Sequence, residues 1–432
     1  MFSNISHWIL GWYKWVHPSD NQLYNAGDYT DLWSRDDREY LNVNADNGNV
    51  NHTDNPTNGH SVRSLNTMHL EYFFQAYFDC RRRKRRTSEA LQFEEYYEKH
   101  CLRLHHEIRT WTYKPDNYKL IYVTDPVMRE IFVPSFRDRV VHHLLANWLR
   151  PKLERFFIYD NYAGWEGRGT LFGIRRAEKF MRQVTQNYQK PVYILKLDIA
   201  SYFRSIPKKG LWEKVKKIVQ NESPCQGGMP FRAGGSWWGG SFRERERELM
   251  NLLKTVIFHD PRTHYSGNIH PDFPKNKSLF SAPPDRWLPL WDLVSQLLGN
   301  FYLHELDHFI KHKLRIKHYG RYMDDMIFFH SDRKVLENVI ADIRNFLAQK
   351  LWLELHEWKI TLNPCEQGIL FLWAYIKPWR TYIGNRTKKK MYECISERDE
   401  ERFEAQMDSY MGLMGHFQTA RLRKNIEKIL HD

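Results

Sequence analysis

The sequence has few cysteines and lacks any long apolar run. The five cysteines are far apart and form no CxxC pair; they are Cys80, Cys101, Cys225, Cys365 and Cys394. This spacing argues against a zinc module or a disulfide frame and predicts isolated thiols in a reducing compartment. A helix that crosses a bilayer needs about 20 consecutive apolar residues, and no stretch approaches that length.

The beginning of the sequence also lacks the features of a secretory signal. The segment MFSNISHWILGWYKWV has no cationic start and no small-residue cleavage site, both of which a signal peptide requires. Together with the missing apolar run, this predicts a cytoplasmic protein without a membrane partner.

Acidic residues are in deficit. The 432 residues include 65 Lys and Arg against 52 Asp and Glu, which gives a formal net charge of +13. An excess of this size favours a polyanionic partner, most commonly nucleic acid, although a merely soluble basic protein is the alternative. Hydrophobic residues make up 42% and aromatic residues 15% of the chain, enough for a globular protein of two or three packed units.

Apolar residues are scarce in residues 17–66, which are rich in Asn, Asp, Gly and Thr. Such residues bond to nearby backbone groups and favour turns over long elements. A calcium loop around Asp46, Asn47 and Gly48 is excluded, because the ligand spacing fails and no glutamate stands at the closing position. We therefore predict an N-terminal extension at residues 1–66.

The remaining chain alternates between helical and strand patterns. Apolar residues recur at helical spacing over 70–111, where RRRKRR (81–86) is either a phosphate contact or a solvated helix end. A strand pair and a helix over 137–157 follow, and a glycine-rich insert is expected at about 222–245. The last fifty residues are basic and helical in pattern. Strands interleaved with helices predict an α+β fold.

Three aspartates stand where predicted strands end. Asp324 and Asp325 interrupt the apolar strand run RYMDDMIFF, and Asp198 ends the strand of VYILKLDIASYF. A pair of aspartates at a turn is usually structural, but three carboxylates on neighbouring strands repel each other unless cations neutralise them. Magnesium suits such oxygen ligands. Two magnesium ions about 3.5–4 Å apart would activate a hydroxyl and stabilise a leaving phosphate, which predicts nucleotidyl transfer.

The motifs that surround these acids extend the pattern. In chain order they are SFRDRVVHHLL, FFIYDNYAGWEGRGT, LKLDIASYF, VSQLLGNFYLHELDHF, RYMDDMIFF, LELHEWKITL and FLWAYIKP. This ordered set resembles a reverse transcriptase from about Leu70 to the C-terminus. It is most similar to the bacterial group of group II intron, retron and diversity-generating retroelement enzymes. KSLF and SYMGLMGHFQTARLRK are most like the diversity-generating and defence-associated members.

The resemblance implies a right-hand polymerase with fingers, palm and thumb. Fingers and palm would span residues 67–378, and a helical thumb would span 379–432. The palm would be an antiparallel sheet backed by helices. Asp198 and the hairpin of Asp324 and Asp325 would lie on adjacent strands.

The resemblance also implies roles for single residues. Asp198, Asp324 and Asp325 would be the catalytic, metal-binding acids. Phe203 matches the aromatic gate that disfavours a ribose 2′-OH, and Arg129 matches the finger residue that grips the triphosphate.

Five further positions are implied. Ser295 and Gln296 match the SQ pair beside template and nucleotide, and Lys359 matches the lysine proposed as the acid for pyrophosphate release. Tyr322 and Met323 belong to the same box as the acid pair and would line the template/primer channel. Each has a structural alternative: Phe203 as core, Arg129 and Lys359 as surface charges, Gln296 as a helix cap.

Tryptophans replace small or basic residues of the family pattern. WLPLWDLVSQ stands where the family has GLPIGNLTSQ, so Trp287 and Trp291 replace glycines. Trp373 replaces the glycine of FLGY, and Trp165 stands at an expected arginine. A tryptophan fills space and offers a stacking face, so we predict that Trp287 and Trp291 line the template/primer channel. Either that channel is reshaped, or the site is damaged and the chain survives as a scaffold.

The function that follows from the resemblance is RNA-directed DNA synthesis. It would use two Mg²⁺ ions (Mn²⁺ being the alternative) and dNTPs, with an RNA template or a non-coding RNA partner and a DNA product. A second protein or self-association is left open. The role we expect is anti-phage defence. Mutagenic retrohoming by a diversity-generating retroelement is the first alternative, and residues 32–64 do resemble the Asn-rich ending of its lectin-like targets. A catalytically altered nucleic-acid-binding subunit is the second.

Overall fold

The computed structural model describes residues 69–82, 87–124, 128–165, 167–220, 239–290, 292–397 and 403–431. All of them belong to one compact unit. The N-terminal extension predicted for residues 1–66, most of the glycine-rich insert and Trp291 lie outside the described residues.

The first described segment is helical, as its apolar spacing predicts. The backbone leaves helical geometry at Tyr96, so residues 88–109 form two helices rather than one. The helices are α3 (Glu71–Arg81), α4 (Ser88–Glu95) and α5 (Tyr97–Arg109), and α3 packs against α6 (Phe136–Glu154). His142 and His143 of α6 are buried.

The first strands of the described chain belong to a three-stranded sheet. In it β1 (Tyr118–Val123) pairs antiparallel with β2 (Arg129–Val133) and parallel with the short β4 (Tyr265–Ser266). Two single-turn helices follow β4, η1 (Lys275–Lys277) and η2 (Leu279–Ser281). Tyr118, Leu120 and Phe132 form a small core beneath them.

The acids lie on a four-stranded antiparallel sheet of order β5-β6-β3-β7. Its strands are β3 (Tyr193–Leu197), β5 (Tyr319–Tyr322), β6 (Asp325–His330) and β7 (Thr361–Pro364). Leu197 of β3 is opposite Met326 of β6. The prediction of an antiparallel sheet with Asp198 and the hairpin on adjacent strands is therefore confirmed.

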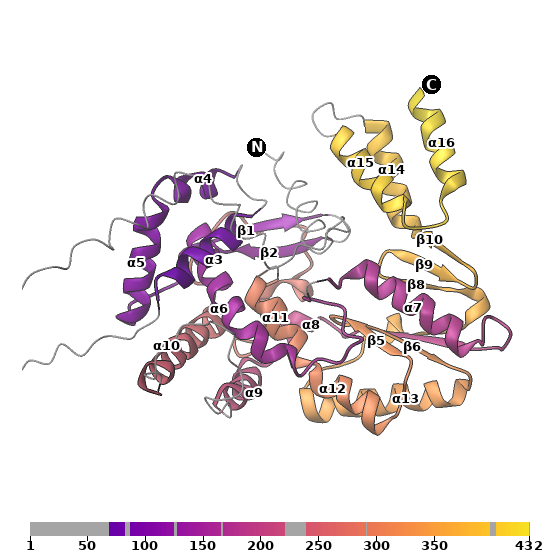
Figure 1. Cartoon of the computed structure of the whole chain (residues 1–432), viewed down its shortest axis with the longest axis horizontal. Helices are drawn as coiled ribbons and strands as arrows, with labels where there is room; N and C mark the ends of the chain where they lie inside the picture. The colour runs from indigo at the N-terminus through magenta and orange to yellow at the C-terminus, as the bar shows by residue number, and fades with distance from the viewer. Residues whose placement is uncertain are drawn as a thin grey trace, which may run out of the picture. The chain divides into compact units, whose positions relative to one another are not determined.

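Helices cover both faces of this sheet (Figure 1). Because side chains alternate along a strand, Ile194 packs with residues of α7 (Thr170–Val184), while its neighbour Leu195 belongs to the larger core that includes α13 (Arg333–Phe346). The larger core also contains residues of α9 (Lys208–Gln220), α10 (Gly239–Phe258), α11 (Leu293–Tyr302) and α12 (His304–His308).

A second three-stranded sheet, of order β10-β9-β8, follows β7. Its strands are β8 (Ile369–Phe371), β9 (Ala374–Lys377) and β10 (Arg380–Ile383). The chain ends in α14 (Asn385–Glu397), α15 (Phe403–Met414) and α16 (Ala420–His431), which share a core of their own with Ile383. Short elements complete the described fold: α8 (Tyr202–Ser205), η3 (Phe309–Lys313), η4 (Leu347–Leu351), η5 (Glu357–Lys359) and η6 (Cys365–Gln367).

The predicted mixture of helix and sheet is thus confirmed, whereas its division into fingers, palm and thumb stays a prediction. Among the described residues, no helix is both long enough and apolar enough to cross a membrane.

Candidate active site

Asp324 lies in the tight turn that joins β5 to β6. Tyr322 pairs with Asp325 across the hairpin, which leaves Met323 and Asp324 as the two turn residues. Met323 takes a positive φ of 53°, a conformation that two-residue hairpins favour. Because Leu197 is opposite Met326, the next residue of each strand, Asp198 and Asp325, comes to the same end of the sheet.

The three carboxylates repel one another at this end of the sheet. Burial, followed by repulsion from Asp198 and Asp325, raises the pKa of Asp324 to about 7. Burial also raises the pKa of Asp325, although Lys196 opposes that shift. The cluster therefore holds more negative charge than its surroundings neutralise, which is the electrostatic condition of a cation site.

Two lysines neutralise part of this charge. Lys359 of η5 donates from Nζ to Asp198 Oδ2, and Lys196 Nζ lies 3.1 Å from Asp325 Oδ1. The amide of His356, three residues before Lys359, donates to the Asp198 carbonyl over 2.8 Å. Sequence reasoning paired Lys359 with the same site, and the structure brings it directly to an acid.

The carboxylates fit a divalent cation by their chemistry. In the described part of the chain, no three His, Cys, Asp or Glu side chains converge tightly enough to form a metal site. Asp198 and Asp325 each turn toward a lysine instead. Hard divalent cations prefer oxygen ligands of this kind, and a cation would relieve the repulsion that raises the pKa of Asp324. The donor set fits.

A buried arginine holds the turn that carries Asp324. The Arg321 side chain is fully buried and pairs with Asp307 of α12 through both carboxylate oxygens, at 2.8 Å and 2.6 Å. Its Nη1 also donates to the carbonyl of Met323 over 2.9 Å. Charge-assisted bidentate pairs of this kind fix geometry as well as charge. Arg321 thus ties the turn to α12.

Asn300 of α11 extends this buried network. Its side-chain oxygen accepts from Arg321 Nη1 and from Asn161 Nδ2, each over 3.0 Å, and its Nδ2 donates to the Ala163 carbonyl over 2.7 Å. The motifs IYDNYAG, LGNFY and RYMDD therefore meet at one point behind the turn. Sequence reasoning missed this role, although polar residues at 300 and 307 inside an apolar helical stretch were the available signal.

Phe203 lies beside α11. Its ring is so close to Gly299 that a Cβ added there would be 3.1 Å from Phe203 Cε1. The preceding Tyr202 donates its hydroxyl hydrogen to the Gly299 carbonyl. The half-buried Phe203 is therefore held by α11, the helix whose first turn contains the SQ pair.

The two residues of the SQ pair have different surroundings. Ser295 is buried and its hydroxyl lies 3.3 Å from Asp292 Oδ2; its predicted place beside the template stays a prediction. Asp292, not Gln296, is the cap of α11, because it accepts from the Val294 amide over 3.0 Å. The half-buried Gln296 keeps its predicted nucleotide role as a prediction.

Arg129 is exposed at the first position of β2, opposite Val123, and its contact with a triphosphate stays a prediction. The next residue, Glu130, is buried and accepts from Ser278 Oγ over 2.9 Å and from the Leu279 amide over 2.6 Å. KSLF is therefore bonded to β2.

The structure does not support a channel role for Trp287. Its side chain is fully buried in the core of the first sheet, with Tyr118, Leu120 and Phe132, so it offers no stacking face to a template. Its φ of 139° is nevertheless one that favours glycine. The backbone has thus kept a glycine-like conformation while the indole fills the core.

The remaining motif residues are Trp373 and Trp165, which lie outside the acid turn, and Tyr322 and Met323, which belong to it. Trp373 donates from its indole to Thr170 Oγ1 over 2.8 Å, and the guanidinium of Arg168 lies 4.1 Å from the ring centroid of Trp165. Tyr322 is half-buried, and burial raises its pKa to about 12. Tyr322 and Met323 flank Asp324 as the sequence requires, and their contact with a template stays a prediction.

Comparison with known proteins gives limited similarity. No protein-family model matches the sequence, and no curated protein matches it. Among solved structures, the chain is similar to apo telomerase from Candida tropicalis truncated from its C-terminal domain, with 12% identity and a TM-score of 0.44 over 62% of this chain and 55% of that one. It is also similar to telomerase from Candida albicans in complex with a TWJ fragment of telomeric RNA, with 10% identity and a TM-score of 0.43 over 67% of this chain and 51% of that one. The chain thus spans about half of each telomerase chain.

Proposed function

We propose that the chain is an RNA-directed DNA polymerase that joins dNTPs to a primer 3′-OH. The observation that carries this proposal is the meeting of Asp198, Asp324 and Asp325 at one end of the sheet, where repulsion helps to raise the pKa of Asp324 to about 7. Carboxylates that repel one another oppose folding unless a ligand neutralises them, and groups with strongly shifted pKa values are therefore concentrated at functional sites.

Asp198, Asp324 and Asp325 would hold two Mg²⁺ ions, or Mn²⁺ in their place. When bound, such ions supply a lowered pKa for the attacking hydroxyl and charge stabilisation for the leaving phosphate. The residues of the chain do the positioning. Arg321 fixes the turn that presents Asp324, and Lys196 keeps positive charge beside Asp325.

Three further side chains would act on the nucleotide. Phe203, held against Gly299, would exclude a ribose 2′-OH. Arg129 and Gln296 would bind the triphosphate and the base-paired nucleotide. Lys359, which donates a hydrogen bond to Asp198, would protonate the pyrophosphate as it leaves.

The proposed partners are an RNA template or a structured non-coding RNA, with DNA as product. The support is the net charge of +13 together with the motif set. We propose a role in anti-phage defence; mutagenic retrohoming is the alternative, and a neighbouring lectin-like gene with a template repeat would favour it.

Primer extension tests the proposal. The full chain is given dNTPs, Mg²⁺ or Mn²⁺, and a primer annealed to RNA or to DNA. We expect extension on RNA, and a fall of about a thousandfold or more when Asp324→Asn and Asp325→Asn are combined, since metal catalysis contributes several kcal/mol. Asp342→Asn, on an exposed position of α13, is the matched control and should keep full activity.

The melting temperature separates loss of chemistry from loss of fold. Because the wild-type acids repel each other, the double variant should melt no lower than wild type without metal. Extension that persists in the double variant would refute the proposal. A wild-type chain that binds RNA but extends nothing under any of these conditions would instead support the nucleic-acid-binding subunit.

A further inference from the structure

The sheet β8-β9-β10 has two unlike faces. On one face Ile369, Phe371, Ala374 and Ile376 are buried against the core that includes α7. On the other face the side chains reach solvent: Leu370 is 47% exposed and Tyr382 is 38% exposed, Arg380 is exposed, and Tyr375 and Lys377 are half-buried. We call these five residues the tyrosine face.

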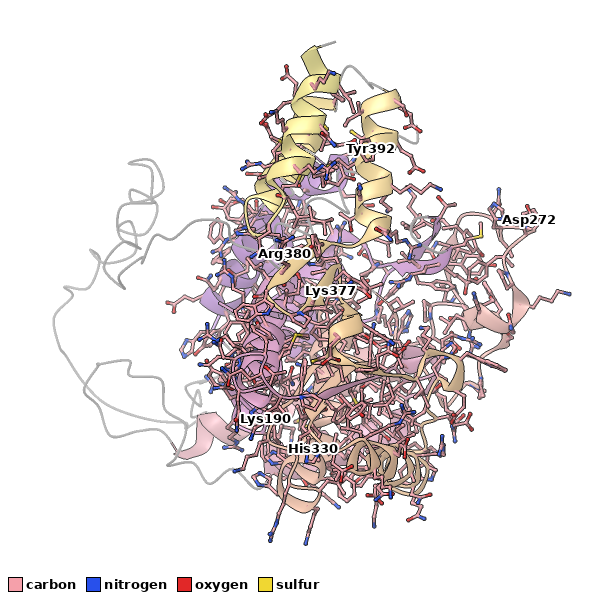
Figure 2. All side chains as sticks on the ribbon, turned by 90° about the vertical axis from the view of Figure 1, so that its right-hand side faces the viewer. Lys190, Asp272, His330, Lys377, Arg380 and Tyr392 are labelled. Atoms are coloured by element: carbon pink, nitrogen blue, oxygen red, sulfur yellow. The ribbon has the colours of Figure 1, made fainter. Side chains whose placement is uncertain are left out.

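Strand register places the residues of the tyrosine face in two rows. Tyr375 is opposite Leu370 on one side and opposite Tyr382 on the other, so an aliphatic residue and two aromatic rings cross the sheet in one row. Lys377 and Arg380 are opposite each other in the next row on the same face. Figure 2 shows these two cations close together on the side that faces the viewer.

The ring of Tyr375 is held in place before any ligand arrives. Its hydroxyl donates to the carbonyl of Gln367 over 2.7 Å. Gly368, at a φ of +76°, leaves room for the ring, since a Cβ there would lie 2.9 Å from Tyr375 Cε1 and 2.6 Å from Lys377 Cγ. A ring fixed in this way loses little conformational freedom when it binds.

The charge of the tyrosine face favours an anion. The strands read ILF, AYIK and RTYI and contain no acidic residue. Glu366, exposed on the adjacent η6, is the nearest acid in sequence before β8. The Lys377 Nζ lies 5.7 Å from the Tyr375 ring centroid, so cationic and aromatic contacts are available within one step along a strand.

We propose that the tyrosine face binds single-stranded nucleic acid. Successive bases would stack on Tyr375 and Tyr382, and phosphates would contact Lys377 and Arg380. Stacking platforms of aromatic residues on a sheet, flanked by cations, are how proteins hold unpaired bases, because bases in a duplex already stack on each other. The face belongs to a different sheet from the acids, and this proposal does not rest on the proposed polymerase activity.

Binding is measured by fluorescence anisotropy with the full chain, without metal or dNTPs. The probes are labelled oligonucleotides of about 12 nucleotides: single-stranded RNA, single-stranded DNA and duplex RNA. We expect the Tyr375→Ala, Tyr382→Ala double variant to bind the single strands about 100-fold more weakly, from about tenfold for each of the two stacked bases. The RNA and DNA arms decide which strand the face prefers.

Two control variants and one test of the cations keep the result specific. Tyr375→Phe with Tyr382→Phe keeps both rings and should bind within about threefold of wild type. Tyr96→Ala removes a tyrosine that is 57% exposed elsewhere and should change nothing. Lys377→Gln with Arg380→Gln should lower the slope of log K against log salt by about 1.4, since a single strand gives about 0.7 per phosphate contact.

Two outcomes would overturn the proposal: single-strand affinity that the Ala double variant leaves unchanged, or wild-type binding of duplex RNA as tight as that of the single strands. Primer extension by the same variant separates this proposal from the polymerase. A chain that extends a short annealed primer normally but has lost single-strand binding supports a separate site.

Discussion

Two buried cations, Arg321 and Lys208, are held in opposite ways. Arg321 is fully buried and has a carboxylate partner in Asp307, with further acceptors in Asn300 and the Met323 carbonyl. Lys208 is 2% exposed, and its Nζ lies 3.2 Å from the His259 carbonyl and 3.3 Å from the centroid of the Trp287 ring. Arg321 keeps its charge, whereas burial lowers the pKa of Lys208 to about 7.

The difference shows that this fold fixes a buried charge behind the acid turn but not beside Trp287. Behind the acid turn, every donor of the buried cation meets an oxygen, so the position of Asp324 depends on a rigid polar network. Around Trp287, the lysine lies against an indole and a single carbonyl, and the Arg262 guanidinium lies 5.6 Å from the centroid of the same ring, which packs in an apolar core. The first region fixes charged groups behind the acid turn; the second is a core. Substitutions that remove the carboxylate partner of Arg321, the Trp287 indole or the Lys208 ammonium test this contrast.

The largest effect is expected from Asp307→Ala. It leaves the guanidinium of Arg321 buried without its carboxylate, and the Tyr319 hydroxyl loses an acceptor at 2.7 Å. We expect the free energy of unfolding, measured with urea, to fall by about 3–5 kcal/mol. Arg333→Ala breaks an exposed pair with Glu337 and should change it by less than about 1 kcal/mol. Similar losses in the two variants would contradict the contrast.

Trp287→Ala should come next, with a loss of about 3 kcal/mol or more from the emptied core. The sharper test is Trp287→Gly. Because φ is 139° at this position, glycine avoids a strain of about 1 kcal/mol that alanine retains. We expect the glycine variant to be the more stable of the two by urea unfolding. The reverse order would show that the backbone is not glycine-like.

The last prediction concerns the pH dependence of stability, where the change per pH unit is smaller than the losses above. Burial lowers the pKa of Lys208 to about 7 from its ordinary value of 10.5, so between these values the unfolded chain binds a proton that the folded chain does not. Stability from this group therefore rises with pH across that window, by about 1.4 kcal/mol per unit. Lys208→Met should lose this slope relative to wild type in urea unfolding at several pH values. Parallel curves for the two proteins would mean that Lys208 stays charged.

The sequence predicted the acid site better than its surroundings, for a physical reason. Strand ends, a hairpin turn and the apolar alternation on each side are local patterns, and they were enough to bring Asp198 beside Asp325. Trp287 could not be placed in this way, because its neighbours Tyr118 and Lys208 come from distant parts of the chain. The same holds for Asp307, whose partner Arg321 is specified by packing of α12 against the hairpin.

The central claim is that the three acids bind a divalent cation. Binding of Mn²⁺ to the full chain, followed by electron paramagnetic resonance, tests it most directly, with the Asp198→Asn, Asp324→Asn double variant as comparison and Asp342→Asn as control. We predict that wild type and control bind Mn²⁺ alike and that the double variant binds at least about 100-fold more weakly, since each carboxylate lost removes a ligand and a charge. Equal binding by wild type and the double variant would contradict the account.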